Sequence, residues 1–103
     1  MTNRIVWLTG LSGAGKTTIA MAVAERVGCE VLDGDTIRDF FSNKDFSREG
    51  RKRHLLGISR MANMISKHTD VICSFITPYE DVREEILDIL PYNAVMVTAF
   101  AFI

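Results

Sequence analysis

The chain has 103 residues, of which 48% are apolar, and a formal net charge of −1 at pH 7. This length allows one small domain and excludes two, and the near-zero charge excludes the broad basic field with which proteins bind duplex nucleic acid. Because no apolar segment is long enough for a membrane helix and no secretory leader precedes the first apolar run, we expect a cytoplasmic protein with no membrane or nucleic-acid partner.

The first half of the chain alternates short apolar runs with helical patterns. The expected elements are, in chain order, a buried strand over 5–9, a helix over 16–27, a strand over 30–32, a short helix over 36–41 and a loop over 42–46. In the first helix Ile19, Val23 and Val27 recur on one face, and Gly28 is the expected stop. Cys29 lies beside the second strand, without metal-ligand spacing to another cysteine, and is interpreted as a buried, reduced thiol.

The second half continues this alternation. The expected elements are a long helix that opens at Ser47, a buried strand over 71–76, a helix over 79–90 and a strand over 94–97. The core stripe of the long helix comprises Leu55, Ile58, Ala62 and Ile65. Arg53, Arg60 and Lys67 recur at seven-residue intervals and mark a solvated face of the same helix. Cys73 lies inside the third strand and is expected to be buried.

A glycine-rich segment joins the first strand to the first helix and fits the pattern G-x-x-x-x-G-K-[ST]. Glycines let backbone N–H groups surround a phosphate, and the following helix adds its positive end. Lys16 is placed to contact the β- and γ-phosphates of ATP, and the Thr17 hydroxyl is placed to bind Mg²⁺. A turn that binds nothing is the alternative, but the strand before the motif and the helix after it favour a nucleotide site. Its expected residues are Gly10, Leu11, Ser12, Gly13, Ala14, Gly15, Lys16, Thr17 and Thr18.

Strands that alternate with helices predict a parallel sheet with right-handed crossovers. Together with the phosphate-binding motif, this pattern indicates the α/β class, as a three-layer fold of the P-loop NTPase type. The sheet is expected to end after about four strands, because the chain stops in the apolar segment 99–103. We therefore interpret residues 1–103 as a single P-loop kinase domain that is incomplete.

Two carboxylates, Asp33 and Asp35, flank Gly34 at the end of the second strand. Ligands of open α/β sheets lie beyond the carboxyl ends of the strands. One carboxylate could orient Mg²⁺ while the other accepts a proton from an attacking hydroxyl, and an ordinary Asp-Gly-Asp turn is the alternative. Ser74 ends the third strand, where a cation-binding carboxylate is common, so the pair gains importance.

Basic residues crowd the first turns of the long helix. They are Arg48, Arg51, Lys52, Arg53 and His54, with Arg38 one turn after the acidic pair. Each exposed cation near a helix N-terminus costs roughly 0.3–1 kcal/mol. Such a run is typical either of a site for an anionic substrate or of a solvated charged face, and both alternatives remain open.

Taken together, these segments resemble the adenylylsulfate kinase (APS kinase) family, which transfers phosphate from ATP to the 3′-hydroxyl of adenosine 5′-phosphosulfate. The matching pieces are 10–18, Leu32-Asp33-Gly34-Asp35 with Arg38, Phe46-Ser47 with Arg51, and Ser74-Phe75-Ile76-Thr77-Pro78-Tyr79. The resemblance extends over nearly the whole chain. Many kinases share the first piece, and its combination with the Asp-Gly-Asp and Phe-Ile-Thr-Pro-Tyr pieces is much more specific.

The resemblance implies ATP and Mg²⁺ as cofactors and adenosine 5′-phosphosulfate as the substrate. The implied catalytic residues are Lys16, Asp33, Asp35 and Thr77, and the implied Mg²⁺ ligands are Thr17 and Asp33. Arg38 and Arg51 would hold the phosphosulfate and Phe46 would stack on the adenine. The remaining residues implied at the substrate are Asp35, His54, Ile76 and Thr77. Thr77 replaces a serine that is described as a phosphoserine intermediate in bacterial members.

The chain also departs from the family. His54, Gly50 and Gly57 stand where asparagine, aspartate and arginine are usual. The lid that forms the second half of these kinases is missing, so we expect weak nucleotide binding and little turnover from 103 residues. Two alternatives remain open. In the first, the chain is a kinase for another small molecule or for a nucleic-acid 5′-hydroxyl. In the second, it is a nucleotide-binding half-domain without catalysis that pairs with another chain, which includes pairing with a second copy as a homodimer.

Overall fold

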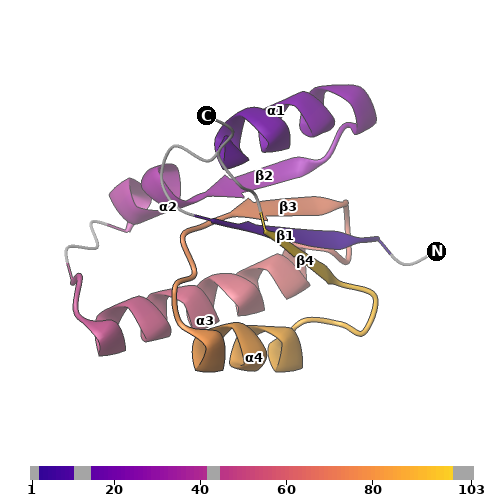
Figure 1. Ribbon diagram of the computed structural model, residues 1–103. Coiled ribbons are helices and arrows are strands. Elements are labelled where there is room, and N and C mark those ends of the chain that lie inside the picture. Colours follow the sequence, from indigo (N-terminus) through magenta and orange to yellow (C-terminus); the bar gives the residue numbers. More distant parts are fainter. Residues whose placement is uncertain (1–2, 11–14, 42–44, 99–103) are drawn as a thin grey trace.

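A computed structural model describes residues 3–10, 15–41 and 45–98 of the chain, with the backbone alone for Asp35 (Figure 1). Its elements are β1 (Ile5–Thr9), α1 (Lys16–Val27), β2 (Glu30–Asp33), α2 (Gly34–Phe40), α3 (Arg48–Ile65), β3 (Val71–Ser74), α4 (Glu80–Ile89) and β4 (Val95–Thr98). Each expected strand and helix is therefore confirmed. The main differences are that α2 begins two residues earlier than expected, and that β3 ends at Ser74 instead of 76.

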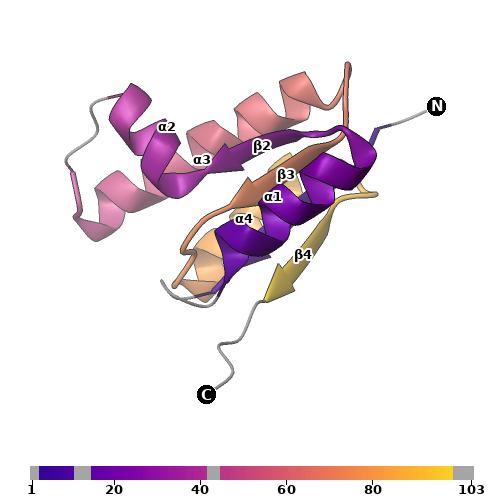
Figure 2. The same cartoon turned by 90° about the horizontal axis from the view of Figure 1, so that it is seen from above.

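The four strands form one parallel sheet in the order β2-β3-β1-β4. Helix α1 covers one face of this sheet, while α3 and α4 lie side by side on the other (Figures 1 and 2). This arrangement confirms the three-layer α/β fold. Because all strands run the same way, their carboxyl ends meet at one edge of the sheet. Asp33 at the end of β2 is thereby paired with Ser74 at the end of β3.

The main hydrophobic core lies between the sheet and the α3–α4 layer. Trp7 is fully buried there and stacks on Phe75 with ring centroids 5.2 Å apart. The expected core stripe of α3 is confirmed, with Leu55, Ile58 and Ala62 buried and Ile65 packed against them. From α4 the buried side chains are Val82 and Ile86, followed by Leu90 just after the helix. The predicted solvated face is exposed at Arg53 and Arg60 of α3 and at Lys67, which follows the end of the helix.

On the opposite face, α1 packs through a small residue. Ala20 is fully buried against Leu8 and Ile72, so the helix backbone comes close to the sheet. The apolar face marked in the sequence by Ile19, Val23 and Val27 is a different one, and these side chains are 45%, 40% and 61% exposed. The spacing of the apolar residues predicts the helix but not the face that packs on the sheet. The packed face contains the small residue Ala20, which an apolar stripe of larger residues does not mark.

The two cysteines lie in different environments. Cys73 is buried as expected, and burial raises the pKa of its thiol to about 12. Cys29 is only half-buried, and the same cause raises its thiol pKa by less. Across the described ranges, no helix combines the length and the apolar composition that crossing a membrane requires.

Candidate functional site

A cavity of about 610 Å³ opens at the carboxyl ends of β2 and β3, beside the first turn of α1. Ten of the residues singled out in the sequence line it, namely Gly15, Lys16, Thr17, Thr18, Asp33, Arg38, Phe46, Arg51, His54 and Ile76. These residues come from α1, β2, α2, α3 and the segments before α3 and after β3. The fold thus collects in one place side chains that are spread over sixty positions of the sequence.

The start of α1 forms one end of the cavity. Gly15 precedes the helix with a φ of 87°, a left-handed conformation that a residue with a Cβ adopts only with strain. The N–H groups of the first helical turn have no partner inside the helix, so they and the helix dipole favour an anion here. Lys16 is buried at the cavity wall and Thr17 is exposed beside it. Of the predicted phosphate-binding residues, Leu11, Ser12, Gly13 and Ala14 lie outside the described residues, and Gly10 has a φ of 144°.

Acidic and hydroxyl groups form the floor between α1 and α2. Asp33 Oδ1 accepts a hydrogen bond of 3.0 Å from the Thr36 amide and so caps α2. The backbone of Asp35 lies in the first turn of α2, and its side chain is outside the described part of the structure. Ser74 also lines the cavity, and its buried hydroxyl has no hydrogen-bond partner among the described residues.

An aromatic ring with two guanidinium groups near it also lines the cavity. Phe46 is 60% exposed, and the Arg38 and Arg51 guanidinium carbons lie 4.8 and 6.0 Å from its ring centroid. Arg51 Nε also donates a hydrogen bond of 3.2 Å to the Phe46 carbonyl oxygen. Arg38 Nη1 is buried, with no hydrogen-bond partner within residues 3–10, 15–41 and 45–98. This part of the cavity is suited to a ligand that has both a flat ring and a negative charge.

The basic run at the start of α3 divides between two environments. Arg48 Nη2 donates to both carboxylate oxygens of Asp81, at 2.8 and 2.9 Å, and the guanidinium lies over the Tyr79 ring. Lys52 pairs with Glu85 at 3.2 Å. These two side chains belong to the α3–α4 contact and do not line the cavity. A further member, Arg53, pairs with Asp45 at 3.1 Å.

Arg51 and His54 are the two members of the run that do line the cavity. Binding of an anionic substrate by Arg51 and His54 remains a prediction, whereas Arg48 and Lys52 are engaged in ion pairs with α4. Burial, and secondly the charge of Arg38, lower the pKa of His54 below its ordinary value. The imidazole is consequently neutral at pH 7.

Thr77 lies behind the cavity wall. Its side chain is 2% exposed, and its hydroxyl accepts a hydrogen bond of 3.1 Å from Trp7 Nε1 and donates one of 3.1 Å to the Phe75 carbonyl oxygen. Arg83 Nη1 donates to the Thr77 carbonyl oxygen at 2.7 Å. The family resemblance implies that Thr77 contacts the substrate, whereas here its side chain is buried behind the wall. A catalytic role for Thr77 remains a prediction, and it would require the hydroxyl to leave both of these bonds.

Known proteins of similar sequence share one description. A model of the adenylylsulphate kinase family matches residues 2–101. The adenylyl-sulfate kinase of Chloroflexus aurantiacus is 45% identical over 94 residues, which cover 84% of this chain and 50% of that protein. The probable adenylyl-sulfate kinase of Aeropyrum pernix is 46% identical over 86 residues, covering 77% and 47%. The chain thus spans about half the length of the curated relatives it matches.

Several solved structures of similar fold are described as kinases. The APS kinase of Mycobacterium tuberculosis, in a complex with AMPPNP and APS, matches with a TM-score of 0.85 and 26% identity, over 94% of this chain and 62% of that one. A gluconokinase from Sinorhizobium meliloti matches with a TM-score of 0.67 and 24% identity, over 94% and 57%. The gluconokinase likeness is one of fold alone.

Acidification should destabilise the protein through His54. Because the pKa of His54 is lowered in the folded state, the unfolded chain binds more protons once the pH falls below about 6.5. The stability that the neutral imidazole contributes is fully present above that pH and is lost as the pH falls further. Thermal melting between about pH 7.5 and 5.5 should show a smaller pH dependence for His54→Asn than for the unaltered chain. Equal slopes in the two proteins would contradict this assignment.

Removal of the Thr77 hydroxyl should destabilise the fold. Thr77→Val leaves Trp7 Nε1 buried without its acceptor, at a cost of about 1–3 kcal/mol in the free energy of unfolding. Thr77→Ser keeps the acceptor and is the matched control. Urea unfolding followed by the fluorescence of Trp7, the single tryptophan, measures both. An equal loss in the two variants would show that the hydroxyl is not what matters.

Proposed function

Because the chain belongs to the adenylylsulphate kinase family, we propose that it carries the phosphate-binding and acceptor-binding half of an enzyme that phosphorylates the 3′-hydroxyl of adenosine 5′-phosphosulfate with ATP. The proposal rests on one observation: the N-terminus of α1 and the Arg38–Phe46–Arg51 group line the same cavity. One end suits a polyphosphate, and the other suits an anion with an attached aromatic base.

At the phosphate end, the segment Gly10–Thr18 would surround the β- and γ-phosphates, and Lys16 would compensate their charge. The residues present fit Mg²⁺, which prefers oxygen ligands and takes one or two carboxylates together with phosphate oxygens. Thr17 and Asp33 would hold it, since Asp33 can cap α2 through Oδ1 and still present Oδ2 to a cation. When bound, Mg²⁺ supplies positive charge that stabilises the transferring phosphoryl group.

At the acceptor end, the Phe46 ring would stack on the adenine while Arg38 and Arg51 bind the phosphosulfate. Neutral His54 and the backbone at Ile76 would complete the wall. In the transfer, the 3′-hydroxyl oxygen bonds to the γ-phosphorus, the bond from that phosphorus to the bridging oxygen of ADP breaks, and a carboxylate accepts the hydroxyl proton. Asp33 and Asp35 are the two candidates for that base.

Stacking at Phe46 should distinguish adenosine 5′-phosphosulfate from other kinase substrates. Phe46→Ala should weaken its binding by about five-fold or more, since stacking of a base on an aromatic ring contributes about 1–3 kcal/mol. Phe40→Ala removes an exposed ring that does not line the cavity and should leave the affinity unchanged. Titration calorimetry measures this, with gluconate, shikimate and an oligonucleotide as competitors. No binding by the unaltered chain, or displacement by one of these competitors, would contradict the proposal.

The length of the chain bears on turnover. Kinases of this kind exclude water from the reaction with a closing lid. The chain spans about half the length of the curated relatives it matches. In a coupled assay of ADP release, these 103 residues by themselves should therefore turn over little even where they bind both ligands. Robust turnover would refute this expectation while leaving the proposed substrate in place.

A nucleotide-binding half-domain that pairs with another chain is the second candidate. Exposed apolar side chains on α1 and β4 favour it, namely Ile19, Met21, Val23, Val27, Val95 and Val97. Such side chains at a helix face and at a strand on the edge of a sheet are typical of surfaces that associate. Sedimentation of the chain with and without Mg-ATP should then show a dimer or larger species. A monomer under both conditions would exclude self-association.

A further inference from the structure

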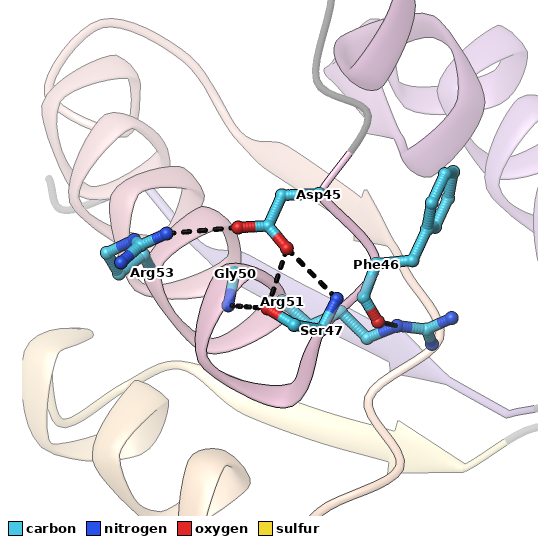
Figure 3. Close-up of polar contacts among 6 residues, drawn as sticks. All are labelled: Asp45, Phe46, Ser47, Gly50, Arg51 and Arg53. Carbon is cyan, nitrogen blue, oxygen red and sulfur yellow. Dashed lines mark hydrogen bonds and ion pairs between the residues drawn. The ribbon is translucent and has the colours of Figure 1, made fainter.

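We propose that Asp45 is a positioning residue for Phe46, because its carboxylate occupies the space that Gly50 leaves open and fixes the entry into α3 (Figure 3). This inference rests on the proposed function, in which Phe46 is the platform for the adenine. Asp45 itself does not line the cavity that holds Phe46. Its effect on a ligand must therefore act through the backbone.

The carboxylate of Asp45 is bonded on both sides of the turn into α3. Oδ1 accepts hydrogen bonds from the Ser47 amide at 3.0 Å and from the Ser47 hydroxyl at 2.6 Å. The Ser47 hydroxyl in turn accepts from the Gly50 amide at 3.1 Å and caps the helix. Phe46 lies between Asp45 and Ser47 in the chain, so this closed set of bonds holds the backbone before and after the ring.

The absence of a side chain at position 50 makes this arrangement possible. A Cβ atom on Gly50 would overlap the carboxyl group of Asp45. Glycine inside a helix lowers its stability relative to alanine. A glycine at position 50 is nevertheless explained by the space that the Asp45 carboxylate requires. The hydrogen bonds from Ser47 hold the pKa of Asp45 below its ordinary value, which keeps the carboxylate charged beside the positive end of α3.

The same segment sets the geometry of the cavity end. Arg51 Nε donates to the Phe46 carbonyl oxygen, and the guanidinium of Arg51 flanks the ring that Arg38 faces. In Figure 3 the Phe46 ring projects away from the Asp45 carboxylate, and Arg53 reaches that carboxylate from the helix. The Arg53 pair is solvent-exposed and contributes little by itself. The constraint on the backbone is therefore the main effect of Asp45.

The consequence for binding is entropic. Without the Asp45 bonds, the residues before α3 sample more conformations, and a ligand that stacks on Phe46 must restrict them. We expect Asp45→Ala to weaken the affinity for adenosine 5′-phosphosulfate about ten-fold, which is the cost of ordering about one residue. The affinity for Mg-ATP at α1 should stay within about two-fold, because that end of the cavity does not depend on the bonds of Asp45.

Moving the carboxylate to residue 50 provides the decisive test. Position 50 is the third residue of α3, from which an acidic side chain can reach back to the Ser47 amide as in a capping box. Gly50→Asp should therefore weaken binding of the phosphosulfate nucleotide in the unaltered chain, where it overlaps Asp45. In the Asp45→Ala background the same substitution should restore it to within about three-fold of the starting affinity.

Titration calorimetry of the four proteins, together with amide hydrogen exchange over residues 46–51, decides the matter. Opposite effects of Gly50→Asp in the two backgrounds support the positioning role, which a general loss of stability would not produce. Unchanged affinity in Asp45→Ala, or an equal effect of Gly50→Asp in both backgrounds, would overturn it. If the unaltered chain does not bind the nucleotide, the proposed function fails. The role of Asp45 is then tested by hydrogen exchange alone. Faster exchange in Asp45→Ala that is slowed again in the double variant supports the positioning role, and unchanged exchange overturns it.

Discussion

The parallel pairing of β3 with both β1 and β2 is the constraint on which the site depends. Its register sets Leu8 and Asp33 on either side of Ser74, so the ends of three strands meet at one edge of the sheet. From that edge the chain enters α1 through Gly15 and enters α2 through the capping carboxylate of Asp33. The phosphate-binding segment and the acidic residues therefore become neighbours although they are distant in sequence.

Helix α3 serves the core, the cavity and its neighbouring helix with different faces. Arg48 and Lys52 are one turn apart, and so are their partners Asp81 and Glu85 on α4. This matching spacing places both ion pairs between the first turns of α3 and the first half of α4. Arg51 is rotated away from that line and faces the cavity instead. The charge at the start of α3, unfavourable for the helix dipole, is thus partly compensated by carboxylates of α4 and by Asp45.

A buried polar group supports the wall of the cavity from behind. The indole of Trp7, the hydroxyl of Thr77 and the guanidinium of Arg83 hold the segment after β3 in one conformation. That segment presents Ile76 to the cavity, while Phe75 lines the cavity and stacks on Trp7. This group therefore connects the core to the cavity wall through hydrogen bonds and ring stacking.

By itself, the sequence determined what depends on near neighbours. The period of its apolar residues predicted the strands and helices, and local chemistry predicted the stop at Gly28 and the cap at Ser47. The glycine-rich motif and the pieces that accompany it identified the family, which the comparisons confirm. Each of these features requires only residues within a few positions of one another.

Only the tertiary structure decided which surface each side chain faces. Arg48 pairs with a residue 33 positions away and Thr77 with one 70 positions away, so no local pattern could separate them from Arg51 or Ile76. The packed face of α1 was likewise chosen by the sheet beneath Ala20. The reason is physical: periodicity gives the direction of a side chain around its own helix or strand, whereas its partner is fixed by how distant elements pack.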